Sequence, residues 1–137
     1  MRAVTVYLTS DHGLVAVDRA APEPVTLRAV LRLLTQGPTF AEQRRGLQSP
    51  IATVGGAALR STTGTTAAVD VPRSFTSLGG QDQIFAAAQL VYTLTGFPGI
   101  HGVTVWVAGQ RASVPSADGS LLAGPLTRTD YASLAPV

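Results

Sequence analysis

The chain has 137 residues, a net charge of +2 at neutral pH and no cysteine. This length suits one domain with its own core, and a chain without cysteine has neither disulfides nor thiol chemistry. All ten basic residues are arginines, and only Arg44 and Arg45 are adjacent. A nucleic-acid-binding protein usually carries a denser basic patch with interleaved aromatic residues, so we expect no nucleic-acid partner.

The N-terminal segment predicts a β-hairpin. Ala3 to Thr9 has Val4, Val6 and Leu8 at alternate positions, and Leu14 to Asp18 has Val15 and Val17 at alternate positions. The turn formers Asp11-His12-Gly13 separate the two runs. His12 therefore lies on a turn, and we interpret it as a solvated histidine because no carboxylate or nucleophile pattern accompanies it. The first residues also lack the basic and then apolar regions of an export signal.

An amphipathic helix is predicted from Thr26 to Gln36, with Thr26 as its N-cap. Its apolar positions follow the helical spacing i, i+3, i+4 and i+7: Leu27, Val30, Leu31 and Leu34. Gly37-Pro38 ends this helix, because glycine tolerates a left-handed conformation and proline cannot continue a helix. Thr39 and Glu42 then have the spacing of a capping box around a short helical turn.

The middle of the chain predicts a loop and a second hairpin. Gly46 to Gly56 is rich in glycine and contains a proline, so we expect an irregular, mobile loop. Ala58 to Thr62 and Thr66 to Val71 are β-prone runs separated by a glycine. Asp70 lies between two valines on the second run, where an exposed or backbone-bonded carboxylate is more common than a catalytic one.

Asp82 to Thr95 is apolar around most of its circumference, which predicts a helix buried by its neighbours. Gly96 is expected to close this helix in a left-handed conformation, and Pro98 prevents its continuation. The alternation from Val103 to Ala108 then predicts a strand.

The remaining residues, Arg111 to Val137, are rich in Ser, Pro, Gly and Ala, and we expect a tail that docks on the domain. A single helical turn is expected over Thr127 to Tyr131, with Thr129 or Asp130 as its cap. The expected apolar anchors of this tail are Val114, Leu121, Leu122, Leu126, Tyr131 and Leu134.

These elements predict an α+β two-layer sandwich, in which two helices cover one face of a single small sheet, mixed or antiparallel. The non-valine residues of the first and last strands would populate the other face: Thr5, Tyr7, Thr9, Thr104 and Trp106. An exposed tyrosine or tryptophan on that face would suit a partner anchor. The alternative is that Trp106 is buried beneath the tail.

The sequence lacks the common catalytic and cofactor motifs. It has no P-loop, no dinucleotide fingerprint and no H-E-x-x-H, and its two histidines, His12 and His101, cannot supply the usual zinc ligand sets. Its Asp and Glu residues form no cluster in the sequence. We therefore expect no enzyme activity, no metal and no cofactor; the hydrolase alternative requires Asp70, Asp130 and His101 to converge.

Four segments then occur in a recognisable order: VTVYLTSDHGLVAV, LRAVLRLLTQGPT, AALRSTTGTTAAVDVPRSF and AQLVYTLTGFPGIHGVTVWVAG. The most specific parts are Gly37-Pro38-Thr39 after the first helix, and Leu90 to Thr95 with Phe97-Pro98-Gly99 after the second. Over residues 3 to 110 the chain resembles the GerMN domain family, the sporulation and spore-germination protein domain. The resemblance divides the chain into a GerMN-like domain, 1–110, and a C-terminal extension docked on it, 111–137, which looks like that of actinobacterial members.

The resemblance implies a fold like ring-building motifs and a non-enzymatic module outside the cytoplasm. Family members act in envelope or sporulation assemblies, often as lipoproteins, although no export signal or lipobox lies within residues 1–137. The expected partners are envelope proteins, with a homo-oligomer left open and membrane contact only through an anchor outside this sequence. The candidate partner-binding residues are Tyr7, Trp106, Arg128 and Tyr131, and the alternative function is a cell-wall glycan or small-ligand binding module.

Overall fold

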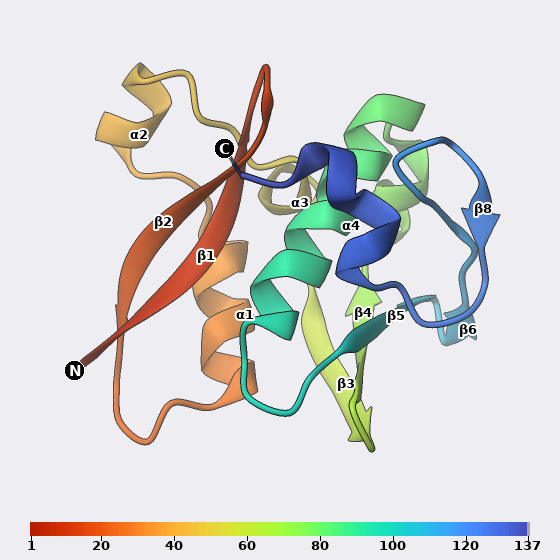
Figure 1. The fold of residues 1–137 in the computed structure, drawn as a ribbon, viewed down its shortest axis with the longest axis horizontal. Coiled ribbons are helices and arrows are strands. Elements are labelled where there is room, and N and C mark those ends of the chain that lie inside the picture. Colours follow the sequence, from red (N-terminus) through yellow and green to blue (C-terminus); the bar gives the residue numbers. More distant parts are fainter. Residues whose placement is uncertain (137) are drawn as a thin grey trace.

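The computed structural model of the chain describes residues 1–136 and confirms the α+β class (Figure 1). The strands are β1 (Arg2–Ser10), β2 (Gly13–Ala21), β3 (Ala58–Thr63), β4 (Thr66–Val71), β5 (Gly102–Val107), β6 (Gln110–Arg111), β7 (Val114–Pro115) and β8 (Leu121–Leu122). The α-helices are α1 (Leu27–Thr35), α2 (Phe40–Arg44), α3 (Pro50–Thr53) and α4 (Gly80–Thr95), and the 3₁₀ helices are η1 (Arg73–Ser77) and η2 (Arg128–Leu134). None of the helices in this part of the chain combines the length and hydropathy needed to cross a bilayer.

The expectation of one sheet is wrong, because the strands divide among three sheets. β1 and β2 form an antiparallel hairpin, β3-β4-β5-β6 form a four-stranded sheet, and β7 and β8 form a short third pair. β3 and β4 are the predicted second hairpin. β4 and β5 pair in parallel, since the chain crosses through η1 and α4 between them.

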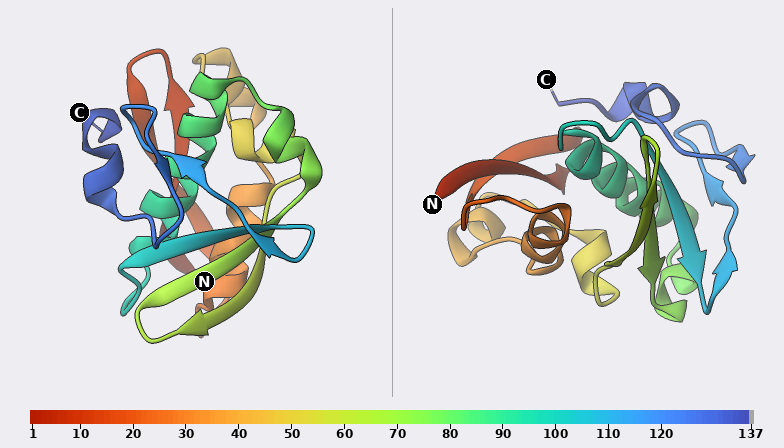
Figure 2. Two further views of the ribbon diagram at one scale, coloured as in Figure 1. Left: turned by 90° about the vertical axis from the view of Figure 1, so that its right-hand side faces the viewer. Right: turned by 90° about the horizontal axis from the view of Figure 1, so that it is seen from below.

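Helix α4 lies between the first hairpin and the four-stranded sheet (Figure 2). Every residue from Ala86 to Leu94 is buried, as the all-round apolar pattern predicted. The two polar residues in this stretch, Gln89 and Thr93, are also buried, and both face the hairpin's first strand. Their hydrogen bonds occupy the edge of β1 at Tyr7, where a further strand would otherwise pair.

The edge of β1 that faces away from β2 is occupied by other groups. The Tyr7 amide donates to Oγ1 of Thr93 at 3.1 Å, and the Tyr7 carbonyl accepts from Nε2 of Gln89 at 3.0 Å. Two residues along, Thr9 exchanges backbone hydrogen bonds of 2.8 and 2.9 Å with Gln48. Helix side chains and a loop residue thus fill the place of a neighbouring strand.

Gln89 also fixes the segment that was expected to be a mobile loop. Its Nε2 donates to Oγ of Ser49 at 2.9 Å, and its Oε1 accepts from the Ile51 amide at 3.1 Å. Ser49 is the N-cap of α3, because its hydroxyl accepts from the Ala52 amide at 3.2 Å. The irregular structure predicted for Gly46 to Gly56 is therefore corrected to a short helix bonded to α4.

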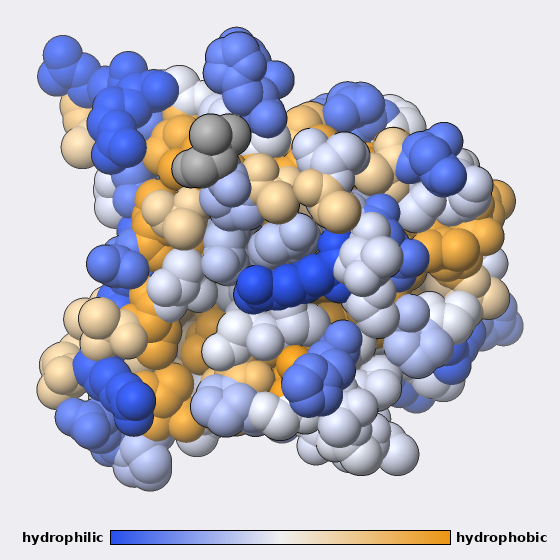
Figure 3. Space-filling model, in the orientation of Figure 1, coloured by the Kyte–Doolittle hydropathy of each residue, from blue (hydrophilic) through white to orange (hydrophobic). Residues whose placement is uncertain are grey.

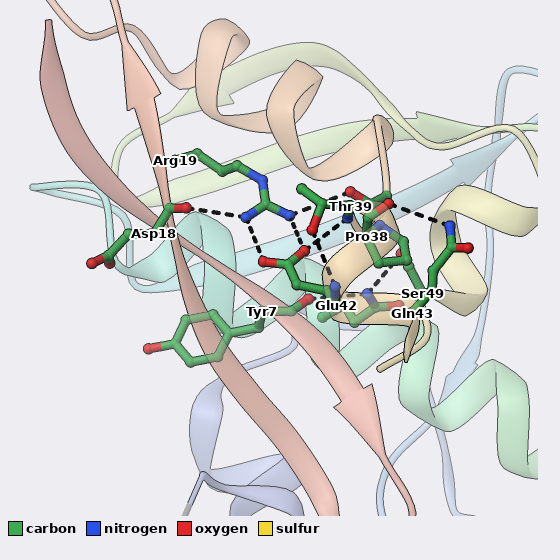
Figure 4. A network of polar contacts seen from close by, with 10 residues as sticks. Tyr7, Asp18, Arg19, Pro38, Thr39, Glu42, Gln43 and Ser49 are labelled. Carbon is green, nitrogen blue, oxygen red and sulfur yellow. Dashed lines mark hydrogen bonds and ion pairs between the residues drawn. The ribbon is translucent and has the colours of Figure 1, made fainter. Parts of the chain in front are cut away.

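Helix α2 is attached to the hairpin by an ion pair rather than by an apolar face. Its only buried residue is Glu42, and both carboxylate oxygens accept from the Arg19 guanidinium of β2, at 2.6 and 2.9 Å (Figure 4). The predicted capping box is present as well, since Thr39 and Glu42 exchange side-chain-to-backbone hydrogen bonds. The hydrogen bonds from Arg19 are the largest cause that lowers the pKa of Glu42, from its ordinary 4.5 to about 2.

The predicted helix ends are confirmed in part. Thr26 caps α1, and Gly37 takes the expected positive φ of 77°. Gly96, however, stays right-handed with a φ of −72°, and the left-handed residue is Gly99, at 87°. The chain thus turns three residues later than expected, after Phe97 and Pro98.

The tail packs against both α4 and β5. Leu126 forms an antiparallel bridge with Val103, and Val114, Leu126 and Tyr131 are buried as expected. Leu121 is 69% exposed, so it is no anchor. The cap of η2 is Thr127, whose amide binds the Asp130 carboxylate at 2.8 Å, which corrects the expected cap at Thr129 or Asp130.

The Gln89 side chain can be tested by substitution with leucine. We expect the free energy of unfolding to fall by about 3 kcal/mol, because buried polar groups of Tyr7, Ser49 and Ile51 lose their partner. Urea denaturation followed by Trp106 fluorescence measures this loss.

Gln83→Leu is the matched control on the same helix. Gln83 is half-buried and makes one side-chain bond, to the Phe75 carbonyl at 3.2 Å, so a loss below about 1 kcal/mol is expected. Equal losses for Gln83→Leu and Gln89→Leu would contradict the central role of Gln89.

The Arg19–Glu42 pair predicts a pH dependence. Because the folded-state pKa of Glu42 lies below its ordinary value, its contribution is complete above about pH 4.5 and is lost as pH falls towards 2. The stability difference between the wild type and Glu42→Gln should shrink by about 3 kcal/mol over this range. Urea titrations from pH 6 to pH 2 test it.

Glu23→Gln serves as the control for that titration, because the Glu23 side chain is 62% exposed. Its effect should stay below about 0.5 kcal/mol at every pH. A constant difference between the wild type and Glu42→Gln would show that the carboxylate does not titrate with folding.

Candidate functional site

A cleft of about 600 Å³ lies between the first half of β1 and the C-terminal end of α4. One wall is β1, with Arg2, Ala3, Val4, Thr5 and Tyr7. The opposite wall is the end of α4 and the turn after it, with Thr93, Gly96, Phe97 and Pro98. The β2–α1 connection and α1 complete the lining with Glu23, Pro24, Val25 and Val30.

The cleft has the chemistry of a recognition surface. Its charged residues, Arg2 and Glu23, are both exposed and opposite in sign. Its remaining lining combines apolar side chains with threonine hydroxyls and the backbone of β1. Such a mixture of apolar area and a few polar groups is typical of ligand and peptide sites.

Tyr7, one of the predicted partner residues, lies in this cleft and is half-buried. Its ring packs edge-to-face against Tyr92 of α4, with ring centroids 5.5 Å apart and an interplanar angle of 67°. The aromatic pair therefore links the strand wall to the helix wall.

Arg128, a second predicted partner residue, reaches the end of α4 from the tail. Its Nη2 donates to the Tyr92 carbonyl at 2.8 Å, its Nε donates to Oγ1 of Thr95 at 2.7 Å, and its guanidinium carbon lies 4.6 Å from the Tyr92 ring centroid. The last turn of α4 contains no basic residue, so Arg128 supplies the positive charge that favours a helix C-terminus. Its contacts thus stabilise the cleft wall.

Trp106 lies on a different sheet and is not part of the cleft. The Arg60 guanidinium stacks 4.3 Å from its ring centroid, and that of Arg111 lies at 5.9 Å. Its Nε1 donates to Oγ1 of Thr104 at 3.3 Å. The ring is half-buried among these residues, which is neither of the two placements expected for it.

Tyr131 is fully buried, and its hydroxyl donates to the Pro115 carbonyl at 2.8 Å. Burial, and secondly the negative charge of Asp130, raises the pKa of Tyr131 well above its usual range. The side chain is therefore part of the core and is not accessible to a partner.

The expected open face does not form as one surface. Thr5, Tyr7 and Thr9 belong to the first hairpin, whereas Thr104 and Trp106 belong to the four-stranded sheet. Thr9 and Thr104 are buried. The residues of this face are therefore separated because the strands are not in one sheet.

The remaining titratable residues of the sequence analysis have structural partners or face solvent. Asp70 pairs with Arg60 at 2.9 Å on the surface, and Asp130 caps η2. His12 and His101 are exposed. Within residues 1–136, no three side chains among His, Asp and Glu gather as a metal site.

A second cleft, of about 560 Å³, is formed by the segment around α3 with the end of α1 and the start of α4. Its one charged residue is Asp82, and the rest of its lining is largely Gln, Pro, Ser and Thr. Part of the segment Gly46 to Gly56 therefore lines a surface hollow. We favour the first cleft, because it contains a predicted aromatic residue and a strand edge.

The face of Figure 3 shows apolar side chains gathered over the β1–β2 hairpin and, on the opposite side, over β8.

Sequence reasoning missed Ala3, Thr5 and Phe97 as site residues. Phe97-Pro98 was noted only as a family signature, since no local pattern shows that the end of α4 faces β1.

Comparisons with known proteins agree with this architecture. The profile of the Germane family, described as sporulation and spore germination, matches residues 5–113. No curated protein matches the chain. Two solved structures from Bacillus subtilis share the fold: the tandem GerMN domains of the sporulation protein GerM, with a TM-score of 0.69 and 18% identity, and its first GerMN domain, with 0.68 and 19%.

The alignments cover 95% of this chain and 47% of the tandem-domain structure, and 94% of this chain and 99% of the single domain. The chain thus spans about half of the tandem-domain structure and corresponds in extent to one GerMN domain. Because the family profile covers most of the chain and the fold is the same, the chain belongs to the Germane family of sporulation and spore-germination domains.

Proposed function

We propose that this domain is a non-enzymatic protein-interaction module that acts in assemblies of the bacterial cell envelope, outside the cytoplasm. The observation that carries the proposal is the cleft of about 600 Å³ beside β1, which combines an aromatic residue, apolar walls and backbone groups. Membership of a sporulation and spore-germination family supports the setting. The expected partner is another envelope protein.

The organisation of the polar residues supports interaction rather than catalysis. The carboxylates of Glu42, Asp70 and Asp130 are each bound to an arginine or a helix N-terminus. Glu23, in the cleft, faces solvent, without a histidine among the lining residues. General acid–base chemistry needs paired groups close to a bound substrate, whereas these groups hold elements of the fold.

Anchoring to the membrane would come from outside the described domain. We propose that the full-length protein is a lipoprotein, with a lipobox cysteine encoded upstream of Met1.

The division into a GerMN-like unit, 1–110, and a docked extension, 111–137, also stays a prediction. Arg128 supports it, because this tail residue binds the end of α4.

A photo-crosslinking experiment tests the interaction function. p-Benzoylphenylalanine is placed at Phe97, on the cleft wall, in the full-length protein expressed in its own cells. Illumination is expected to give a discrete adduct with an envelope protein, identified by mass spectrometry, because a bound partner would lie against the label.

Phe40 provides the matched control, because it is a phenylalanine on α2 and is 74% exposed. Labelling there should give no adduct with the same protein. Absence of any envelope adduct at Phe97, together with turnover of a cell-wall substrate by the purified protein, would overturn the proposal.

The glycan-binding alternative has less support, because one ring face of Trp106 is occupied by Arg60 and Tyr131 is buried. We expect no heat on calorimetric titration with muropeptides and no shift of Trp106 fluorescence. Saturable binding in both measurements would favour a glycan-binding module instead.

A further inference from the structure

One edge of β1 is paired along only part of its length. In an antiparallel hairpin, residues that bond to the partner strand alternate with residues whose N–H and C=O groups point away from it. The backbone N–H and C=O groups of Tyr7 and Thr9 point away from β2, as their hydrogen bonds to α4 and Gln48 show. The same alternation places the backbone groups of Thr5 and Ala3 on this outer edge.

Along this edge, hydrogen-bond partners are present at Thr9 and Tyr7 and stop at Tyr7 in the direction of the N-terminus. Thr9 is paired with a backbone, and Tyr7 is paired with two side chains of α4. For Ala3 and Thr5, residues 1–136 provide no hydrogen-bond partner on this side. Helix α4 ends at Thr95 and the chain turns away, so the cleft opens where the partners stop.

We propose that this open edge of β1, Ala3 to Thr5, binds an extended peptide segment of a partner protein as an added strand. The proposal rests on the interaction function above and names how that function is carried out. Residues two apart on a strand are separated by about 7 Å. An extended guest peptide has the same repeat, so its backbone can form hydrogen bonds with the N–H and C=O groups of both Ala3 and Thr5. The antiparallel bridge between Thr9 and Gln48 shows that this edge already accepts such a backbone.

The walls of the cleft indicate which peptide fits. Val25, Val30 and Phe97 lie around the edge, so alternate side chains of the guest would be small or apolar. Arg2 and Glu23 are of opposite charge and exposed at the cleft, so no strong net charge is selected. The expected occupant is therefore a short, weakly charged, β-prone segment.

The test uses peptides of about eight residues selected from a display library on the purified 137-residue chain. Thr5→Pro removes one outward N–H, and proline is tolerated on an edge strand where this group does not bond within the sheet. The variant should weaken peptide binding at least about tenfold, measured by fluorescence anisotropy, because a ladder hydrogen bond is lost and the ring obstructs the edge.

Ala16→Pro is the matched control. Ala16 is the register partner of Tyr7, is exposed, and has an N–H that points away from β1 on the far edge of the hairpin. Its effect on affinity should stay below about twofold, because this edge lies outside the cleft. Thermal unfolding of both variants shows whether the hairpin is intact.

A second measurement keeps the test decisive if Thr5→Pro does not fold. Peptides are N-methylated at alternate residues in the two registers, and binding to the wild type should be lost in one register and kept in the other. Equal affinity in both registers, unchanged affinity in a folded Thr5→Pro, or no binding up to about 1 mM would each overturn the proposal.

Two further outcomes separate this inference from the wider function. Self-association of the wild type that Thr5→Pro abolishes in sedimentation experiments would make a second copy the occupant and overturn a partner peptide. An envelope adduct at Phe97 that persists in Thr5→Pro would refute peptide binding at the edge of β1, while the proposed interaction function would stand. Peptide binding without any envelope adduct would refute the envelope function alone.

Discussion

The fold depends on the hydrogen bonds of Gln89 inside an otherwise apolar helix. Helix α4 passes along a strand edge in the core, where an unpaired backbone carbonyl is costly. Gln89 accepts from the Ile51 amide and donates to Tyr7 and Ser49, so one fully buried side chain joins the hairpin, α3 and α4. A core of apolar residues alone would exclude water from these groups and would offer them no other hydrogen-bond partner.

This arrangement decides where a partner can bind. Because α4 takes the place of a third strand, the hairpin and the four-stranded sheet stay separate and pack on opposite sides of it. Helix α4 ends at Thr95, and the cleft lies at this end of the helix. Arg128 donates to the Tyr92 carbonyl and the Thr95 hydroxyl in the last turn of α4, so the tail helps to fix the wall of the cleft although it lies far along the sequence.

Local patterns in the sequence predicted most elements of the fold. The caps at Thr26 and Thr39 depend on residues three positions apart, and the first hairpin depends on alternation within each strand and on the turn between Ser10 and Gly13, all of which a sequence displays directly. The sheet arrangement depends on contacts between residues 82 apart, such as Gln89 and Tyr7, and these have no local signal. For the same reason the cleft itself was missed, and Tyr131 was assigned to partner binding although its role as an apolar anchor of the tail was expected and is confirmed. Tyr7, which lines the cleft, was marked by strand alternation.

The shortness of the open edge of β1 also limits unwanted pairing of this edge with further strands. Long, flat and unpaired strand edges recruit further strands and lead to stacked assemblies. Here Gln48 and α4 cover the edge from Thr9 to Tyr7, and only the stretch around Ala3 and Thr5 is open, with exposed Arg2 next to it. Such a stretch offers too few hydrogen bonds for indiscriminate stacking, and a guest strand must gain the rest of its binding energy from the side chains of the cleft.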